Sequence, residues 1–277
     1  MTSPTSRFPL ITFVGGGNMA SAILGGLVRQ GHPVDRIQVI EPWDEQRARL
    51  AQQFPGLTLL AAAGPELATP DLVIWAIKPQ TFREAAAAAA DFLGHPLHLS
   101  VAAGITSDSI ARWLGSERIV RAMPNTPALV GLGMTGLVAR TAVTPEDRTL
   151  AESVIRTIGE LVWVSTEADL DAVTALSGSG PAYVFYFLEA MRDAGARMGL
   201  PPEVAYQLAV GTFVGAATLA QRSGEPPQVL RERVTSKGGT THAAITSMDA
   251  ADIKGLFETA LKAAQTRAAE LGQAFGA

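Results

Sequence analysis

From residue 8 to about residue 164 the sequence alternates short apolar runs with stretches of helical character, and this alternation constrains the fold more than any other feature. Strands joined through helices run parallel, so the pattern predicts an α/β fold with a doubly wound parallel sheet covered by helices. The predicted strands are residues 9–14, 37–40, 57–60, 72–76, 97–102, 118–122, 134–139 and 161–164. The predicted helices between them are residues 19–30, 44–54, 80–93 and 107–114.

After about residue 166 the strand signals end, and the pattern predicts helices alone. They are residues 167–176, 181–198, 202–222, 226–234 and 241–275, the last with a break near Ala250. We therefore expect two domains, residues 1–165 and residues 166–277. Aromatic residues at 183 and 185–187 place apolar groups on more than one face of a helix, and a domain of about 110 residues buries such a helix poorly by itself. A homodimer formed through the helical domain is the expected result.

Composition excludes several classes of site. The chain has no cysteine, which rules out disulfides, zinc–thiolate sites and thiol nucleophiles, and its four histidines lack the spacing of metal ligands. Its net charge is -4 with scattered Lys and Arg, so we expect no nucleic-acid partner. The longest apolar stretch, residues 204–220, contains a glutamine and is shorter than the roughly 20 residues that span a bilayer. Residues 1–7 are polar and precede a predicted strand, which favours a cytoplasmic location.

A glycine-rich segment, Gly-Gly-Gly-Asn-Met-Ala, follows the first predicted strand and begins the first predicted helix. It fits the G-x-G-x-x-A form of the dinucleotide fingerprint. Gly15 permits a tight turn, Gly17 leaves room for a pyrophosphate, and Ala20 lets the helix pack closely on the sheet. The helix N-terminus, with Asn18 and Met19, presents amides to the phosphates. The N-terminal domain is therefore predicted to be a Rossmann-like domain that binds NAD or NADP.

Two further positions belong to the predicted cofactor site. Glu41 ends the second strand, where an acidic side chain accepts hydrogen bonds from the adenine ribose. This favours NAD, but Arg47 and Arg49 lie nearby and can meet a 2′-phosphate, so the sequence leaves NAD and NADP open. Lys78 follows the strand that ends at Ala76, at the edge where parallel sheets bind ligands. Its alternative role is an ordinary cation before a helix that starts at Pro79.

Three other segments are rich in glycine and small polar residues: 122–126 (AMPNT), 176–182 (LSGSGPA) and 235–241 (TSKGGTT). Such loops expose several main-chain amides, which bind a carboxylate without a cationic side chain. Each segment alone is more typical of a simple helix cap or turn than of a binding site, because serine, threonine and glycine are frequent in caps and turns.

In combination, these segments resemble the pyrroline-5-carboxylate reductases over nearly the whole chain. Residues 171–183 (DAVTALSGSGPAY) look like that family's signature segment. The glycine loop, Lys78-Pro79 and the segments 100–104 (SVAAG), 121–127 (RAMPNTP) and 236–241 (SKGGTT) occur in the family's order. The family usually has proline where this chain has Lys237, so the last loop is expected to be less rigid here.

The resemblance implies reduction of 1-pyrroline-5-carboxylate to L-proline with NADPH or NADH, the last step of proline biosynthesis. It also implies a C-terminal helical domain that binds substrate and forms dimers, which in this family often assemble into larger rings; a decamer of five dimers is the largest assembly we expect. The loop 236–241 would hold the substrate carboxylate, and Thr241 would bond the ring nitrogen. The expected catalytic residues are Thr241 and Lys78. The expected substrate-binding residues are Asn125, Ser236, Gly238, Gly239, Thr240 and Thr241. The expected cofactor-binding residues are Gly15, Gly17, Asn18, Met19, Ala20, Glu41, Ala76, Lys78, Pro79, Ala102, Ala103 and Gly104.

Hydride transfer to a protonated cyclic imine depends on positioning more than on a strong acid. A two-domain hydroxy-acid dehydrogenase, the nearest alternative, would need a general acid or base. Such enzymes commonly carry a lysine one turn into the helix that follows a Gly-x-Gly segment, but this chain has Val184 there and no lysine as far as Met198. A non-catalytic nucleotide sensor is the other alternative, and the intact loop 236–241 weighs against it.

Overall fold

The computed structural model describes residues 8–275, so the interpretation of residues 1–7 lies outside the described residues. The chain forms two compact units. One contains Met1–Ser179 with Ala264–Ala277, and the other contains residues 180–263. The predicted domain boundary at 165/166 differs from the unit boundary at 179/180, because the segment just after residue 165 packs on the sheet. The division into domains at residues 1–165 and 166–277 stays a prediction.

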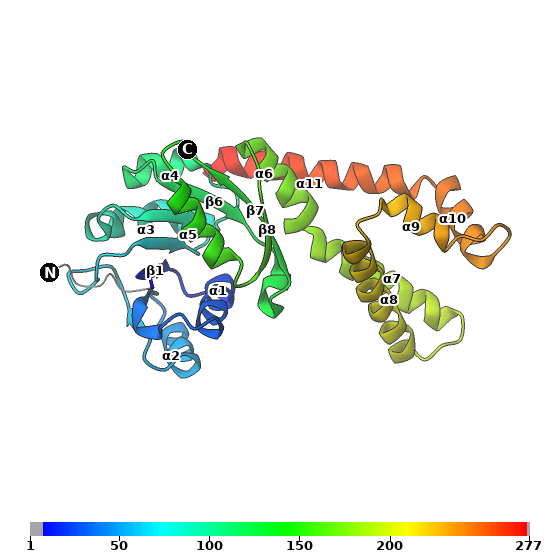
Figure 1. Cartoon of the computed structure of the whole chain (residues 1–277), viewed down its shortest axis with the longest axis horizontal. Helices are drawn as coiled ribbons and strands as arrows, with labels where there is room; N and C mark the ends of the chain where they lie inside the picture. The colour runs from blue at the N-terminus through cyan, green and yellow to red at the C-terminus, as the bar shows by residue number, and fades with distance from the viewer. Residues whose placement is uncertain (1–7, 276–277) are drawn as a thin grey trace. The chain divides into compact units, whose positions relative to one another are not determined.

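An eight-stranded sheet forms the centre of the first unit (Figure 1). Its order is β3-β2-β1-β4-β5-β6-β7-β8. Each predicted strand is present, with its ends within two residues of the prediction. The strands are β1 (Ile11–Val14), β2 (Ile37–Ile40), β3 (Thr58–Leu60), β4 (Leu72–Trp75), β5 (Leu97–Ser100), β6 (Ile119–Met123), β7 (Gly133–Ala139) and β8 (Gly159–Trp163).

The fully parallel sheet that we predicted is wrong at one pair, because β6 and β7 are antiparallel. Between them lie only a short loop and the 3-10 helix η2 (Thr126–Val130). A parallel connection needs a crossover of a dozen or more residues, and this link is too short to provide one. The other described strand pairs are parallel.

Helices cover both faces of the sheet. The four predicted helices are present as α1 (Asn18–Arg29), α2 (Asp44–Gln53), α3 (Pro79–Leu93) and α4 (Ser107–Leu114). Alternate residues of β4 enter different cores: Leu72 and Ile74 pack in one apolar cluster, and Val73 and Trp75 pack in the other. Side chains alternate between the two faces of a strand, so each face of the sheet has its own core.

The sequence patterns did not predict α5 (Pro145–Ile155). Its N-terminus carries a capping box, in which Thr144 accepts a hydrogen bond from the main chain of Asp147 and the Asp147 carboxylate accepts one in return. The sequence Thr-Pro-Glu-Asp shows this start signal. The apolar residues of this helix are too few to form a clear helical pattern, so the sequence pattern did not predict it.

Helices make up the rest of the chain, as predicted. They are α6 (Glu167–Val173), the π-helical η3 (Thr174–Gly178), α7 (Gly180–Arg197), α8 (Pro202–Ser223), α9 (Pro227–Arg233), α10 (Thr240–Ala250) and α11 (Ile253–Phe275). The break predicted near Ala250 falls between α10 and α11. In the second unit α7 and α8 pack closely, since a Cβ on Gly195 would lie 2.6 Å from the Cβ of Ala205. No helix in the described part of the chain has the length and apolarity to cross a membrane.

Candidate active site

The glycine loop connects β1 to α1 in the geometry that the fingerprint predicts. Gly15 has φ +94°, and a Cβ there would lie 2.6 Å from the carbonyl oxygen of Ala76. Gly17 is the N-cap of α1 and is exposed, and a Cβ built on it meets nothing within 4 Å. Ala20 is buried against the sheet. The first amides of α1 have no intrahelical acceptor, so the open space at Gly17 fits a bound pyrophosphate.

Glu41 lies at the carboxyl end of β2 and is bound to the glycine loop. Its Oε2 accepts a hydrogen bond of 2.8 Å from the main-chain N–H of Gly16, and its Oε1 accepts one of 2.9 Å from the N–H of Trp43. Gln46, on α2, donates a hydrogen bond of 2.6 Å to the carbonyl oxygen of Gly16. The two hydrogen bonds to Gly16 fix the glycine loop relative to the end of β2 and to α2, beside the space at Gly17.

Three of the predicted cofactor segments follow β1, β4 and β5, which are neighbours in the sheet. The strand order reverses at β1 and β4, and open sheets of this kind bind ligands at that point. Ala76 begins the loop after β4 and donates a 2.9 Å hydrogen bond to Val14 in β1. Lys78 is exposed at the N-cap of α3, which Pro79 begins. After β5 come Ala102, Ala103 and Gly104, the last with φ +70°.

Asn125 joins the loop after β6 to the signature segment. Its Nδ2 donates a hydrogen bond of 3.1 Å to the carbonyl oxygen of Ser177, and its Oδ1 accepts one of 2.9 Å from the main-chain N–H of Met134. A Cβ on Gly178 would lie 2.7 Å from Cε of Met123, so glycine permits this close approach. The structure thus brings Asn125 and residues 174–178 together. The π-helical turn there is of a kind frequent at functional sites.

An ion pair that joins β6 to α6 was not predicted from the sequence. The guanidinium of Arg121, on β6, pairs with the carboxylate of Glu167, on α6, and the Arg121 side chain is only 8% exposed. The other carboxylate oxygen of Glu167 accepts a 3.2 Å hydrogen bond from the N–H of Ser107, which begins α4. Asp171 lies one turn further along α6, and burial raises the pKa of its carboxyl despite the nearby charge of Arg121. An arginine inside the apolar strand Ile-Val-Arg-Ala-Met was the signal available in the sequence.

The second unit holds the remaining predicted residues in one turn. Gly239 donates a 3.0 Å hydrogen bond to the carbonyl oxygen of Ser236, and Gly238 between them has φ +76°. Gly239 is the N-cap of α10, so Thr240 and Thr241 occupy its first turn. The structure therefore brings Ser236, Gly238, Gly239, Thr240 and Thr241 together at a helix N-terminus. Such a turn binds anions through free amides and the helix dipole.

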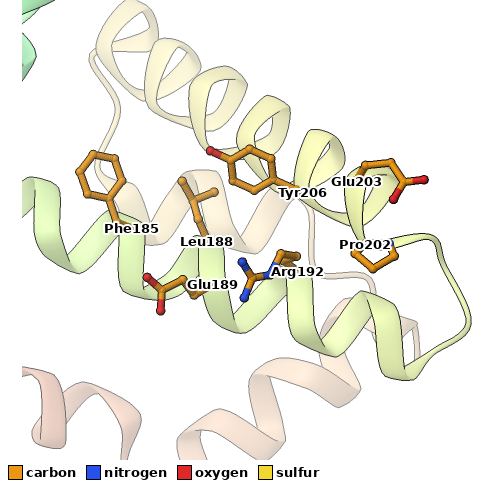
Figure 2. A pocket seen from close by; sticks show the side chains of 7 residues that line it. All are labelled: Phe185, Leu188, Glu189, Arg192, Pro202, Glu203 and Tyr206. Atoms are coloured by element: carbon orange, nitrogen blue, oxygen red, sulfur yellow. The ribbon is translucent and has the colours of Figure 1, made fainter.

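A hollow of about 600 Å³ lies between α7 and α8 in the same unit. Figure 2 shows the side chains that line it, which are Phe185, Leu188, Glu189 and Arg192 from α7 and Pro202, Glu203 and Tyr206 from α8. Phe185 is 57% exposed and Tyr206 51%, which is unusual for aromatic side chains of this size. No group of three His, Asp or Glu side chains within residues 8–275 is arranged to hold a metal ion.

A glycine fingerprint at the switch point of a doubly wound sheet defines the class of dinucleotide-dependent oxidoreductases. Comparison with known proteins places the chain within that class. Residues 167–271 match the family model described as pyrroline-5-carboxylate reductase dimerisation, and residues 10–104 match the model described as NADP oxidoreductase, coenzyme F420-dependent. The pyrroline-5-carboxylate reductase of Pseudomonas aeruginosa is 43% identical over 97% of this chain and 98% of its own length. That of Arabidopsis thaliana is 36% identical over 95% of both chains. The chain belongs to the pyrroline-5-carboxylate reductase family.

Solved structures agree with this assignment. A pyrroline-5-carboxylate reductase from Coxiella burnetii has a TM-score of 0.90 and 38% identity, covering 96% of this chain and 99% of that one. The Plasmodium falciparum pyrroline carboxylate reductase, solved with NADP bound, has a TM-score of 0.82 and 28% identity, covering 95% and 98%. The α/β fold and the helical C-terminal part are thereby confirmed, and the chain is an oxidoreductase that uses a nicotinamide cofactor.

Proposed function

We propose that this chain reduces 1-pyrroline-5-carboxylate to L-proline by hydride transfer from NADH or NADPH, as the last step of proline biosynthesis. The observation that carries the proposal is family membership at 43% identity over 97% of the chain. The turn at residues 236–241 supports it, because its amides suit the carboxylate of a small imino acid.

The substrate carboxylate is assigned to the turn formed by Ser236, Gly238 and Gly239 and to the N-terminal amides of α10. These donors are main-chain groups held by the Gly239–Ser236 hydrogen bond and by the helix. A preformed anion site fixes one end of the ring at little entropic cost, so more of the binding energy goes to orientation. Lys237 is exposed in the same turn and adds a positive charge near the anion.

Thr241 is assigned to the ring nitrogen. It lies in the first turn of α10, half-buried, two residues from the N-cap. In the protonated imine the N–H can donate a hydrogen bond to the threonine hydroxyl oxygen, which orients the C=N bond. The C=N carbon gains a hydride and the nitrogen keeps its proton, so the product is the secondary amine and no further acid is needed. Asn125 is assigned to the same substrate through the loop that its side chain holds in place.

The cofactor is assigned to the first unit, where the glycine loop and the residues after β4 and β5 present main-chain donors. Gly15, Gly17, Asn18, Met19 and Ala20 would hold the pyrophosphate. The other residues, Glu41, Ala76, Lys78, Pro79, Ala102, Ala103 and Gly104, would line the rest of the dinucleotide. When bound, the nicotinamide supplies the hydride. Lys78 would contribute a positive charge beside it, at the end of β4.

The match to a dimerisation model over residues 167–271 supports an oligomer formed through the helical part of the chain. We propose a homodimer, assembled further into a decamer of five dimers. The exposed aromatic side chains of α7 and α8 are the groups expected to be covered. We further propose that the enzyme works in the cytoplasm.

Replacing Thr241 by valine tests the proposed chemistry, because valine keeps the shape of the side chain and removes the hydroxyl. We expect turnover to fall by roughly 10- to 1,000-fold, the range for loss of one positioned hydrogen-bonding group. The measurement is the decrease in NAD(P)H absorbance with 1-pyrroline-5-carboxylate. Thr246→Val, on an exposed position of the same helix, is the matched control and should keep wild-type turnover. Full activity of Thr241→Val would remove Thr241 from the mechanism, and a wild-type chain without activity would refute the proposed function.

A further inference from the structure

We infer that this enzyme prefers NADH to NADPH, and that Glu41 determines the preference; the inference rests on the proposed function. The sequence leaves the choice open because an acidic residue and two arginines lie close together. The structure shows how each of these side chains is held, and the contacts of Glu41 and Arg47 favour the cofactor without a 2′-phosphate.

Both oxygens of the Glu41 carboxylate are fixed by main-chain donors. Oε2 accepts from Gly16 at 2.8 Å and Oε1 accepts from Trp43 at 2.9 Å. The carboxylate therefore lies between the glycine loop and the start of α2, where this fold binds the adenine ribose. A carboxylate has about four acceptor positions, so two remain for ribose hydroxyls. The side chain is already held in the position that a ribose diol requires.

The same contacts disfavour a 2′-phosphate. A phosphate monoester carries a charge of about -1.5 to -2 at neutral pH, and it would lie beside a carboxylate that is half-buried. If Glu41 turned away, the part-buried N–H of Gly16 would lose its acceptor, which costs free energy, whereas the exposed N–H of Trp43 could bond to water instead. The movement of Glu41 that would make room for NADPH is therefore opposed mainly by its hydrogen bond to the fingerprint loop.

The nearby arginines do not compensate for this repulsion. Arg47 donates a 2.6 Å hydrogen bond to the carbonyl oxygen of Glu41, and its other terminal nitrogen pairs with the carboxylate of Asp44. Its charge is thus neutralised by a partner on its own helix. Arg49 is exposed on α2, two residues further on, and residues at that spacing do not share a helix face.

The test is the ratio of kcat/KM for NADH to kcat/KM for NADPH, measured with the full chain and 1-pyrroline-5-carboxylate. We expect the wild-type ratio to exceed about 10, because tenfold corresponds to a modest charge repulsion of about 1.4 kcal/mol. Glu41→Gln removes the charge and keeps the shape, and should move the ratio toward NADPH by at least about 10-fold. Asp44→Asn releases Arg47 and should move the ratio in the same direction.

Gln46→Ala is the matched control, because it removes the 2.6 Å contact with Gly16 without any change of charge. It should lower kcat/KM for both cofactors by the same factor and leave the ratio unchanged. A wild-type ratio below 1, or a ratio that Glu41→Gln does not change, would overturn the inference while the proposed function stands. If neither cofactor is oxidised, the proposed function fails; the dissociation constants of NADH and NADPH, from their fluorescence, then still test the preference.

Discussion

A buried histidine makes the stability of the first unit depend on pH. His98, on β5, is 3% exposed, and its Nδ1 accepts a 3.2 Å hydrogen bond from the indole N–H of Trp75. Burial, together with the smaller effect of the nearby positive charge of Arg118, lowers the pKa of His98 to about 4. A protonated imidazole would carry a hydrogen on Nδ1 and would lose the bond to Trp75. The folded chain therefore holds His98 neutral with its proton on Nε2.

The sign of the effect follows from proton binding. In the unfolded chain His98 has a pKa of 6.5, so between pH 6.5 and about 4 the unfolded state binds a proton that the folded state does not. The free energy of unfolding should fall as pH falls through this window and level off below it. At about 1.4 kcal/mol for each pKa unit, the loss approaches roughly 3 kcal/mol.

Urea unfolding followed by circular dichroism at pH 7, 6, 5 and 4.5, at one protein concentration, measures this dependence. His98→Gln should flatten the curve in that window, since glutamine offers Trp75 an acceptor and does not titrate there. His95→Gln changes an exposed histidine and serves as the control. An unchanged slope in His98→Gln would show that another group is responsible.

Among the secondary-structure elements, the pair of Arg121 and Glu167 connects β6, α6 and the start of α4. Removing one member of a buried ion pair costs about 3–5 kcal/mol, because the other charge is left unpaired. Glu167 is 35% exposed and can regain some water, so Arg121→Met should lower the free energy of unfolding by about 3 kcal/mol, the low end of that range.

Arg267→Met is the comparison, since Arg267 pairs with Glu270 and the two side chains are 66% and 53% exposed. Exposed pairs contribute about 0–1 kcal/mol, so this variant should unfold at nearly the wild-type urea concentration. Equal losses in the two variants would mean that burial of Arg121 adds nothing to the strength of its pair.

Local pattern was sufficient to predict most elements but not their contacts. The strands from β1 to β6 and the helices from α1 to α4 follow from apolar runs and helix signals within a few residues. The antiparallel direction of β7 follows from the short connection between β6 and β7, which no local pattern shows. The π-helical turn at residues 174–178 lies where Asn125 donates a hydrogen bond to Ser177, 52 positions away. The glycine loop and the turn at 236–241 were predictable because their chemistry lies in consecutive residues. The hydrogen bond between Glu41 and Gly16 and the Arg121–Glu167 ion pair could not be predicted, because the partners in each contact are distant in sequence.

At the scale of the whole molecule, the helical unit exposes more apolar surface than a monomer normally tolerates. Phe185, Tyr186, Tyr206, Leu208 and Val214 are each at least 51% exposed, and all five lie on α7 or α8. Large apolar side chains that stay exposed together on a soluble protein commonly mark an interaction surface, and these five are candidates for one. The periodicity of these helices predicted the exposure, because apolar residues occur on more faces than one neighbouring helix can cover.

Tyr206→Asp tests whether this surface holds two copies together. Aromatic residues in the centre of an interface commonly contribute 2 kcal/mol or more, so the dimer dissociation constant should rise by at least about 30-fold. Analytical ultracentrifugation over a range of concentrations should therefore show a shift toward monomer. Trp43→Asp is the control, because Trp43 is 73% exposed on the first unit, outside the helical part of the chain. A Tyr206→Asp protein that stays dimeric, or a Trp43→Asp protein that dissociates equally, would place the contact on another surface. Because an aspartate at either position adds the same charge, only the location of the substitution distinguishes the two results.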